Sequence, residues 1–293
     1  MTRPYTVVDV FSAEPLLGNP VAVVLEAEGL SEAQMGAFAR WTNLSETTFV
    51  LPPTRDGADY WLRIFTPGGE LPFAGHPTLG SAHAVLEAGR AAARDGVLVQ
   101  ECGVGLVQVA VGGSESATAK AGRMTLTLPT PKVRAFADGD VAEIEGLLGH
   151  GVMRTAPPAA VDVGIVWGVA QVASVEVLLA LEPDMVRSAA FERRLELTGL
   201  SVFAVSNDPG VIEVRSFTGS CGIGEDPVCG SGNGAVAAFR AANGQLGPAA
   251  WRYEARQGRR LSRDGRITLS GDDQGVIGVG GDCITTAVGT LAI

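Results

Sequence analysis

The sequence predicts an α+β fold made of two similar lobes, and three observations lead to this fold class. A pattern of strand, glycine-rich turn and small-residue helix occurs twice along the chain. The remainder of each half is rich in short stretches where apolar and polar residues alternate, which is typical of strands. The chain has 293 residues, of which 46% are apolar and 18% charged, so it can bury a core in each of two lobes. The recurrence predicts an internal duplication.

The two copies of the pattern lie at a nearly constant offset. The matched pairs are Arg63/Arg215, Phe65/Phe217, Thr66/Thr218, Gly75/Gly230 and Gly89/Gly244. The first three pairs are 152 residues apart and the last two are 155 apart, so the second copy carries a three-residue insertion. Each copy predicts a helix that begins at a glycine-rich turn and is capped at its C-terminal end by Gly89 or Gly244.

The first lobe is predicted to be strand-rich. Strands are expected at 6–11, 20–24, 47–51, 60–65, 106–111 and 124–128. An amphipathic helix is predicted to begin at Ser31, where Gln34 completes a capping box, and to end near residue 43. That helix is expected to place Met35, Phe38 and Trp41 on one buried face.

The second lobe is predicted to repeat this plan. Strands are expected at 165–172, 201–205, 211–217, 267–269, 276–279 and 284–290, with a helix within 183–194. The glycine- and serine-rich stretch 112–118 predicts a flexible connection. We therefore divide the chain into a first lobe at 1–120 and a second at 121–280, and leave open whether the C-terminal strand near 281–293 returns to the first.

The composition excludes several classes of protein. There are 22 basic against 32 acidic residues, a net charge of -10, which argues against nucleic acid as a partner. Four cysteines without a CxxC pair and three scattered histidines predict no metal site. The sequence has no nucleotide-binding fingerprint, so no cofactor is expected. Without a signal-like segment or a long apolar stretch, we expect a cytoplasmic protein that does not contact a membrane.

The two predicted helix starts indicate an anionic ligand. A helix N-terminus offers backbone N–H groups without intrahelical partners and the positive end of the helix dipole. Two related helices can direct two such ends at one cleft, so we expect a small-molecule substrate that carries a carboxylate.

Four segments together carry a family resemblance. They are DVFSAEPLLGNP at 9–20, LSETTF at 44–49, FTPGGELPFAGHPT at 65–78 and EDP at 225–227. In this order they resemble the phenazine-biosynthesis PhzF-like family, whose fold is similar to that of diaminopimelate epimerase. The resemblance implies two lobes, each a curled, mostly antiparallel sheet around a central helix, with the site in the cleft between them. It also implies a cofactor-independent isomerase that moves a proton between carbons, usually as a homodimer.

Glu46 is the strongest catalytic candidate. It matches the family's proton-shuttling glutamate, and Ser45 beside it in the same motif is expected to bind substrate. We expect Glu46 to lie within a run of strand-forming residues, where partial burial would raise the pKa of its carboxyl toward a useful range. The alternative is a solvent-facing strand residue, since glutamate is usually exposed.

His76 and Asp226 are the other two catalytic candidates. His76 lies at a helix start, where the positive dipole end favours a neutral imidazole. By resemblance it is a hydrogen-bonding or proton-relay group, and Asp226 is expected to pair with it or to hold substrate. A capping or packing role for His76 and a helix-capping role for Asp226 are the alternatives.

The remaining site candidates surround the helix starts. Gly75, Gly230 and Ser231 are small enough for backbone N–H groups to approach a carboxylate closely. Cys229 departs from the family, which usually has threonine there, and resembles a catalytic cysteine of diaminopimelate epimerase. A thiol at a helix N-terminus would have a depressed pKa and could act as a base. The partner cysteine that such an epimerase needs is replaced by Ala74, so we interpret Cys229 as pocket lining and keep proton transfer as an alternative.

These observations support one leading hypothesis and two alternatives. The leading hypothesis is a cofactor-independent isomerase that moves a proton in a small unsaturated or amino-acid-derived carboxylate, in secondary metabolism. The first alternative is an amino-acid epimerase that uses Cys229 as a base. The second is a non-catalytic carboxylate-binding protein, because fold resemblance alone does not establish function.

Overall fold

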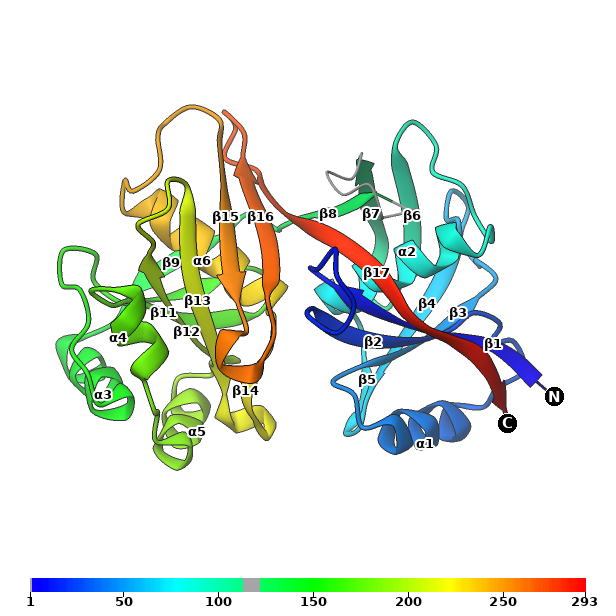
Figure 1. Ribbon diagram of the computed structural model, residues 1–293, viewed down its shortest axis with the longest axis horizontal. Coiled ribbons are helices and arrows are strands. Elements are labelled where there is room, and N and C mark those ends of the chain that lie inside the picture. Colours follow the sequence, from blue (N-terminus) through cyan, green and yellow to red (C-terminus); the bar gives the residue numbers. More distant parts are fainter. Residues whose placement is uncertain (1, 113–121) are drawn as a thin grey trace. The chain divides into compact units, whose positions relative to one another are not determined.

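A computed structural model describes residues 2–112 and 122–293 of the chain (Figure 1). Contacts between Cα atoms divide these residues into two compact units. The first unit comprises residues up to Leu126 together with Gly280–Ile293, and the second comprises Thr127–Val279. The connection predicted at 112–118 lies outside the described residues except for Gly112, which ends a strand.

The first unit contains most of its strands in the N-terminal part of the chain. Its elements are β1 (Thr2–Val10), β2 (Asn19–Val24), α1 (Glu32–Thr42), β3 (Thr47–Leu51), β4 (Tyr60–Thr66), β5 (Gly69–Leu71), α2 (Gly75–Glu87), β6 (Val97–Cys102), β7 (Gly105–Gly112), β8 (Arg123–Thr127) and β17 (Ile277–Ala292). The unit boundaries fall within β8 and β17.

The sheet of the first unit closes on itself. The strands pair in the cyclic order β1, β2, β3, β4, β6, β7, β8 and β17, and β17 pairs again with β1. β5 adds to β4 as a short hairpin partner. The β2/β3 and β4/β6 pairs are parallel, whereas β1/β2, β3/β4, β6/β7, β7/β8 and β1/β17 are antiparallel. The chain ends lie beside each other because β1 and β17 pair along their length (Figure 1).

Helix α2 occupies the inside of this closed sheet. It packs against β1, β2, β3, β4, β6 and β7, and its residues 76–85 are all buried. A side chain at Gly80 would place its Cβ 2.4 Å from Val21 Cγ1, so glycine lets the strand approach the helix. Gly89 has φ +64°, and the N–H groups of Gly89 and Arg90 donate to the carbonyls of Leu86 and Val85. This Schellman arrangement confirms the predicted C-terminal cap.

Helix α1 covers the outside of the first unit. Its predicted capping box is present, because Ser31 and Gln34 bond reciprocally, and the helix ends at Asn43 in the left-handed conformation. The prediction that Trp41 is buried with Met35 and Phe38 is wrong. Trp41 is 79% exposed and stacks on the Phe38 ring. Trp41 lies six residues after Met35, and successive residues are about 100° apart around an α-helix. The two side chains therefore point in directions about 120° apart, which places Trp41 away from the face that Met35 occupies.

The second unit has three α-helices and two short 3-10 helices, η1 and η2, in addition to its central helix. Its elements are β9 (Lys132–Ala135), α3 (Asp138–Leu148), β10 (Ala159–Asp162), β11 (Val166–Gln171), α4 (Val175–Ala180), α5 (Met185–Arg194), β12 (Gly199–Val205), β13 (Val211–Thr218), η1 (Gly219–Cys221), β14 (Ile223–Asp226), α6 (Gly230–Ala242), β15 (Trp251–Gln257), η2 (Arg259–Leu261) and β16 (Gly265–Gly271).

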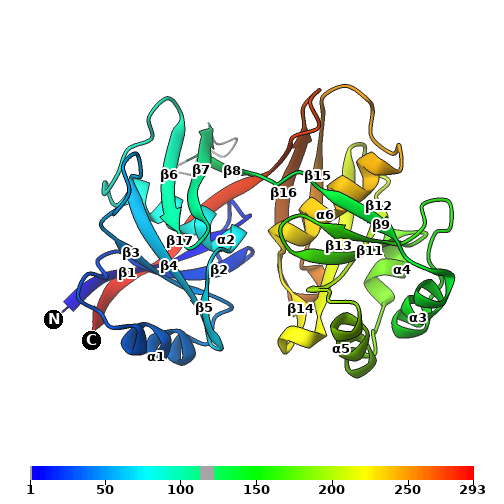
Figure 2. The same ribbon diagram turned by 180° about the vertical axis from the view of Figure 1, so that it is seen from behind.

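The sheet of the second unit runs in the order β9, β10, β11, β12, β13, β15 and β16, with β14 also paired to β13. Helix α6 lies against β9, β10, β11, β12 and β16 (Figures 1 and 2). Gly244 has φ +67° and caps α6 in the same manner as Gly89 caps α2, as predicted.

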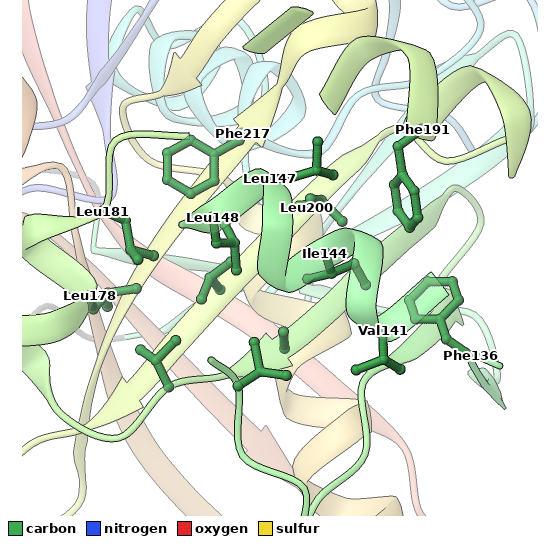
Figure 3. Close-up of a cluster of buried hydrophobic side chains, with 14 of the residues drawn as sticks. Phe136, Val141, Ile144, Leu147, Leu148, Leu178, Leu181, Phe191, Leu200 and Phe217 are labelled. Atoms are coloured by element: carbon green, nitrogen blue, oxygen red, sulfur yellow. The ribbon is translucent and has the colours of Figure 1, made fainter. Parts of the chain in front are cut away.

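The outer helices of the second unit share an apolar core with the sheet (Figure 3). Strand β12 alternates in the manner expected of a buried strand: Leu200 faces these helices, whereas Phe203 contacts the Phe239 ring of α6. From α3, Ile144 and Leu147 enter the core beside Leu200. The sheet is therefore covered on both faces.

Two groups of secondary-structure predictions need correction. The predicted strands at 276–279 and 284–290 form one continuous strand, β17. The glycines between them do not make a turn, because a Cβ at Gly280 would lie 2.3 Å from Thr125 Oγ1 and 2.6 Å from Met124 O. Helices α3 and α4 and strands β5, β6, β9, β10, β14 and β15 were not predicted at all.

Candidate active site

The start of α2 positions the candidates of the first unit. The helix begins at Gly75 behind Ala74, an N-cap in extended conformation whose methyl side chain cannot accept a hydrogen bond. Gly75 is half-buried and His76 is buried. The first turn of α2 therefore directs backbone N–H groups and the positive dipole end toward the Gly75 position.

Glu46 and His76 lie together in the first unit. Glu46 Oε2 is 3.2 Å from His76 Nε2, and their side chains are only 15% and 9% exposed. Glu46 immediately precedes β3, which has the predicted bounds. Ser45, half-buried, adjoins it in the same bend. The α1–β3 connection thus brings a largely buried carboxyl group against the imidazole at the helix start.

Burial governs the protonation state of His76. It lowers the pKa of the imidazole to about 3, so the ring is neutral near neutral pH. A neutral ring was expected from the helix dipole, but desolvation is the dominant cause. A neutral imidazole has one N–H donor and one acceptor, so it can share a proton with a neighbouring carboxyl group without adding charge to the site.

Asp226 ends β14 in the second unit, directly before the turn into α6. Its Oδ1 accepts a hydrogen bond from the N–H of Val228 at 3.0 Å, which shapes the turn. Asp226 does not cap α6, because the N-cap is Cys229. Burial raises the pKa of the Asp226 carboxyl to about 6, and the neighbouring Glu225 also raises it. Asp226 can therefore exchange a proton near neutral pH.

Cys229 caps α6, and the prediction that its thiol has a depressed pKa is wrong. Its Sγ accepts from the N–H of Gly232 at 3.3 Å and lies 3.6 Å from Ser231 Oγ. The side chain is buried, and burial together with the Asp226 carboxyl raises the thiol pKa well above its ordinary value. These effects outweigh the helix dipole. The thiol is protonated near neutral pH and is poorly suited to act as a base.

Gly230 and Ser231 form the first turn of α6, and both are half-buried. Ser231 Oγ accepts a hydrogen bond from the indole N–H of buried Trp167 at 3.2 Å. A Cβ at Gly232 would lie 2.4 Å from Ser201 Oγ, so a glycine is required there. The helix start is thus packed tightly against β11 and β12.

The sequence analysis missed two buried polar residues at this turn, Gln257 and Asn233. Both are fully buried, and Asn233 Nδ2 donates to Gln257 Oε1 at 2.7 Å. Gln257 lies on β15, which was not predicted, and a glutamine in a strand is normally interpreted as solvent-facing. The GSGNG sequence of 230–234 was the available signal for Asn233.

The candidates separate into one group in each unit. Ser45, Glu46, Gly75 and His76 belong to the first unit, and Asp226, Cys229, Gly230 and Ser231 belong to the second. The pairing of Asp226 with His76 stays a prediction. Within residues 2–112 and 122–293 no group of three or more His, Cys, Asp or Glu residues could hold a metal ion. Over the same residues, no helix is long and apolar enough to cross a membrane.

Comparisons with known proteins give a consistent result. A family model described as "Phenazine biosynthesis-like protein" matches residues 8–288. The "Antisense-enhancing sequence 1" protein of Schizosaccharomyces pombe is 38% identical over 268 residues, covering 90% of this chain and 89% of that protein. The trans-2,3-dihydro-3-hydroxyanthranilate isomerase of Pseudomonas aeruginosa is 35% identical over 277 residues, covering 92% and 91%. A crystal structure of a PhzF-family protein of Bacillus anthracis shares the fold, with a TM-score of 0.89, 24% identity and full coverage of both chains.

Proposed function

This chain belongs to the phenazine biosynthesis-like, or PhzF-like, family and is an isomerase, and we propose that it moves a proton between carbons of a small carboxylate without a cofactor. Glu46 takes a proton from one carbon of the substrate, becomes a neutral carboxylic acid, and returns the proton to another carbon. The electron pair of the broken C–H bond shifts the double bond, so the substrate and product are isomers. Ser45 helps to bind the substrate beside this carboxyl group.

The 3.2 Å approach of Glu46 Oε2 to His76 Nε2 is the observation that carries this proposal. A general base must accept a proton and later release it, which requires a pKa within reach of the working pH. Glu46 is largely buried, and the imidazole beside it is neutral, so His76 places no fixed positive charge next to the candidate base. His76 assists as the neutral imidazole that lies against the Glu46 carboxyl group.

The second unit supplies the assisting groups in this proposal. Asp226, with its raised pKa, holds the substrate or relays a proton, and Cys229 lines the pocket. The backbone N–H groups at Gly75, Gly230 and Ser231 bind the substrate carboxylate. That both helix starts serve one substrate stays a prediction, which a structure with a bound carboxylic acid would test.

The relatives and the chemistry of the site support the proposed substrate class. The Pseudomonas aeruginosa relative is named for trans-2,3-dihydro-3-hydroxyanthranilate, an amino- and carboxyl-bearing diene. A substrate of this kind has a C–H bond made acidic by the adjacent unsaturation and a carboxylate for the helix starts. We place the reaction in secondary metabolism on this basis.

The test is proton NMR of substrate panels in deuterated water. Wild-type protein is mixed with trans-2,3-dihydro-3-hydroxyanthranilate, other dienoic acids and amino acids, and the position of any incorporated deuterium is recorded. The proposal predicts a shifted double bond, with deuterium at the newly protonated carbon in those turnovers where the Glu46 proton exchanges with solvent before it is returned. Deuterium at an α-carbon whose configuration inverts, with no double-bond shift, would contradict it.

We also propose that the two lobes arose by internal duplication. Helices α2 and α6 have 13 residues each and begin 155 residues apart. Arg63 forms a two-pronged ion pair with Glu70, and Arg215 forms the same pair with Glu225. Each arginine lies over the phenylalanine two residues later, at 5.1 Å and 4.8 Å from the ring centroid. The three-residue insertion is accommodated between β13 and β14, where η1 replaces a tight turn.

A homodimer and a cytoplasmic location complete the proposal. The family resemblance supports the dimer, and the absence of a candidate membrane-spanning helix among the described residues is compatible with the location. Sedimentation equilibrium tests the dimer, with a single species at twice the chain mass of 30.2 kDa as the expected result.

A further inference from the structure

We propose that Gln257 is a positioning residue that holds the turn carrying Asp226 and Cys229 in its reactive geometry. The catalytic role of the turn rests on the proposed function. The claim that Gln257 holds the turn in place rests on hydrogen bonds within the second unit. Gln257 is the last residue of β15, and its side chain is fully buried.

A single amide group of Gln257 joins three points around the turn. Its Nε2 donates to the main-chain carbonyl of Asp226 at 2.9 Å. Its Oε1 accepts from the main-chain N–H of Cys229 at 3.1 Å and from Asn233 Nδ2 at 2.7 Å. Asn233 Nδ2 also donates to the Cys229 carbonyl at 2.9 Å. The strand end is therefore bonded to the turn before the helix, to the helix N-cap and to the first helical turn.

The backbone after Gln257 is equally close to the turn. Gly258 has φ +103°, and a Cβ on it would lie 2.7 Å from the carbonyl oxygen of Pro227. Only a glycine fits this approach without displacing main-chain atoms. With the amide contacts on one side and this close approach on the other, the segment from Asp226 to Cys229 has little freedom to move relative to β15. Catalytic groups held in this way keep the geometry that proton transfer needs.

Among the described residues of the first unit this clamp is absent at the equivalent place, which provides a matched control. The residue 155 positions before Gln257 is Cys102, whose short side chain has no amide. On the same strand, Gln100 is fully buried and donates to Thr78 Oγ1 at 3.0 Å while accepting from Tyr60 Oη. Thr78 is the counterpart of Asn233 at the same offset. Gln100 thus makes the strand-to-helix bond without bonding to the main chain before the helix.

The test compares Gln257→Leu with Gln100→Leu in the full chain. Carbon-13 NMR of protein labelled at aspartate carboxyl groups follows the titration of Asp226, whose signal is assigned by its loss in Asp226→Asn. Releasing the turn exposes the carboxyl group, so Gln257→Leu should lower the pKa of Asp226 toward its ordinary value. Gln100→Leu should leave it unchanged, although both variants lose a buried amide.

Activity supplies the second readout. In the deuterium assay, Gln257→Leu should lower kcat by about 10- to 100-fold with a smaller change in KM, as expected when a supporting contact of a reactive group is lost. Gln257→Glu keeps an acceptor for Cys229 and Asn233 and should recover part of the rate. Gln100→Leu should retain kcat within about threefold, which is under 1 kcal/mol of transition-state stabilisation.

The two readouts separate this inference from the proposed function. If wild-type protein turns over none of the acids but only Gln257→Leu moves the Asp226 titration, the clamp is supported and the proposed function fails. If both leucine variants move the titration equally, or neither does, the clamp is overturned. Failure of both Gln257 variants to fold would also overturn it, because the residue would then serve stability alone.

Discussion

Residues at equivalent positions of the two units have the same strand pairing but differ in chemical type. Thr47 is paired with Phe65, and Leu200 is paired with Phe217, the matching phenylalanine of the second unit. Glu46 precedes Thr47 in the first unit, and Gly199 precedes Leu200 in the second. The second unit therefore has no side chain where the first has its candidate base.

The helix starts differ in the same way. The N-cap is Ala74 in α2 and Cys229 in α6, and the second helical residue is His76 in α2 and Ser231 in α6. A symmetric two-base enzyme would need equivalent bases in both units. The contact between one carboxyl group and one buried histidine lies within a single unit, as the proposed single proton shuttle requires. The comparison teaches that the recurring sequence pattern places a helix start in each unit, whereas the residues at those starts differ in chemical type.

The substitution Gly199→Ala tests whether the second unit can accommodate a side chain at the position equivalent to Glu46. A Cβ there would lie 2.2 Å from the Phe217 carbonyl oxygen and 2.9 Å from Trp167 Cζ3, so main-chain atoms must move. We expect Gly199→Ala to lower the free energy of unfolding by about 3 kcal/mol, as overpacking does when the backbone has to shift. Urea denaturation measures the loss.

Gly139 provides the control for this prediction. It lies in α3, and nothing is within 4 Å of the Cβ that alanine would add. Gly139→Ala should therefore stabilise the protein by about 0.5 to 1 kcal/mol. A Gly199→Ala variant as stable as the wild type would show that the second unit can accommodate a side chain at the position equivalent to Glu46.

The two arginine ion pairs should differ in strength although their geometry is the same. Arg215 is 5% exposed and also donates to the carbonyls of Leu178 and Leu181, whereas Arg63 is 17% exposed and pairs with more exposed carboxylates. Arg215→Lys should cost about 2 to 3 kcal/mol of unfolding free energy, because a lysine cannot satisfy all of these acceptors. Arg63→Lys should cost less than about 1 kcal/mol. Equal losses in denaturation experiments would mean that burial does not distinguish the pairs.

Asp226 should make the stability of the protein depend on pH. Its folded-state pKa of about 6 lies above the ordinary value of 3.8, so between these pH values the folded protein holds a proton that the unfolded chain releases. The contribution of Asp226 to stability therefore falls as pH rises from about 4 to about 6, and then levels off. The stability of Asp226→Asn relative to wild type should rise by about 1 to 2 kcal/mol across this window, after allowance for partial exposure. A constant difference between the two proteins from pH 4 to pH 7 would contradict the raised pKa.

Much of the local structure could be predicted from the sequence. The caps at Gly89 and Gly244, the capping box at Ser31 and both central helix starts follow from residue types with strong positional preferences. Strands β1 to β4, β7 and β8 of the first unit were predicted because their alternation is regular. The family motifs likewise indicated Glu46 and His76, which the structure brings within contact distance.

The remainder depends on contacts that a local pattern does not contain. In the sequence, Gly280 resembles a break in a strand. In the structure it lies within β17, where the main chain of Met124 approaches it closely. The thiol of Cys229 has the sequence context of an activated cysteine, but burial and the Asp226 carboxyl reverse the effect. Gln257 has no sequence signal at all, because its three bonds connect β15 to a turn 31 residues earlier. Desolvation and long-range pairing decide these cases.

Paired turnover of Glu46→Gln and Cys229→Thr in deuterated water tests the single-shuttle account most directly. Glutamine keeps the shape of Glu46 but cannot carry a proton, so this variant should lose at least about 10² to 10⁴-fold in rate while binding is retained. Cys229→Thr should retain turnover, because the protonated thiol only caps the helix and lines the pocket. The opposite pattern, an active Glu46→Gln and an inactive Cys229→Thr with deuterium at an inverted α-carbon, would show that Cys229 is the base and that the protein is an epimerase.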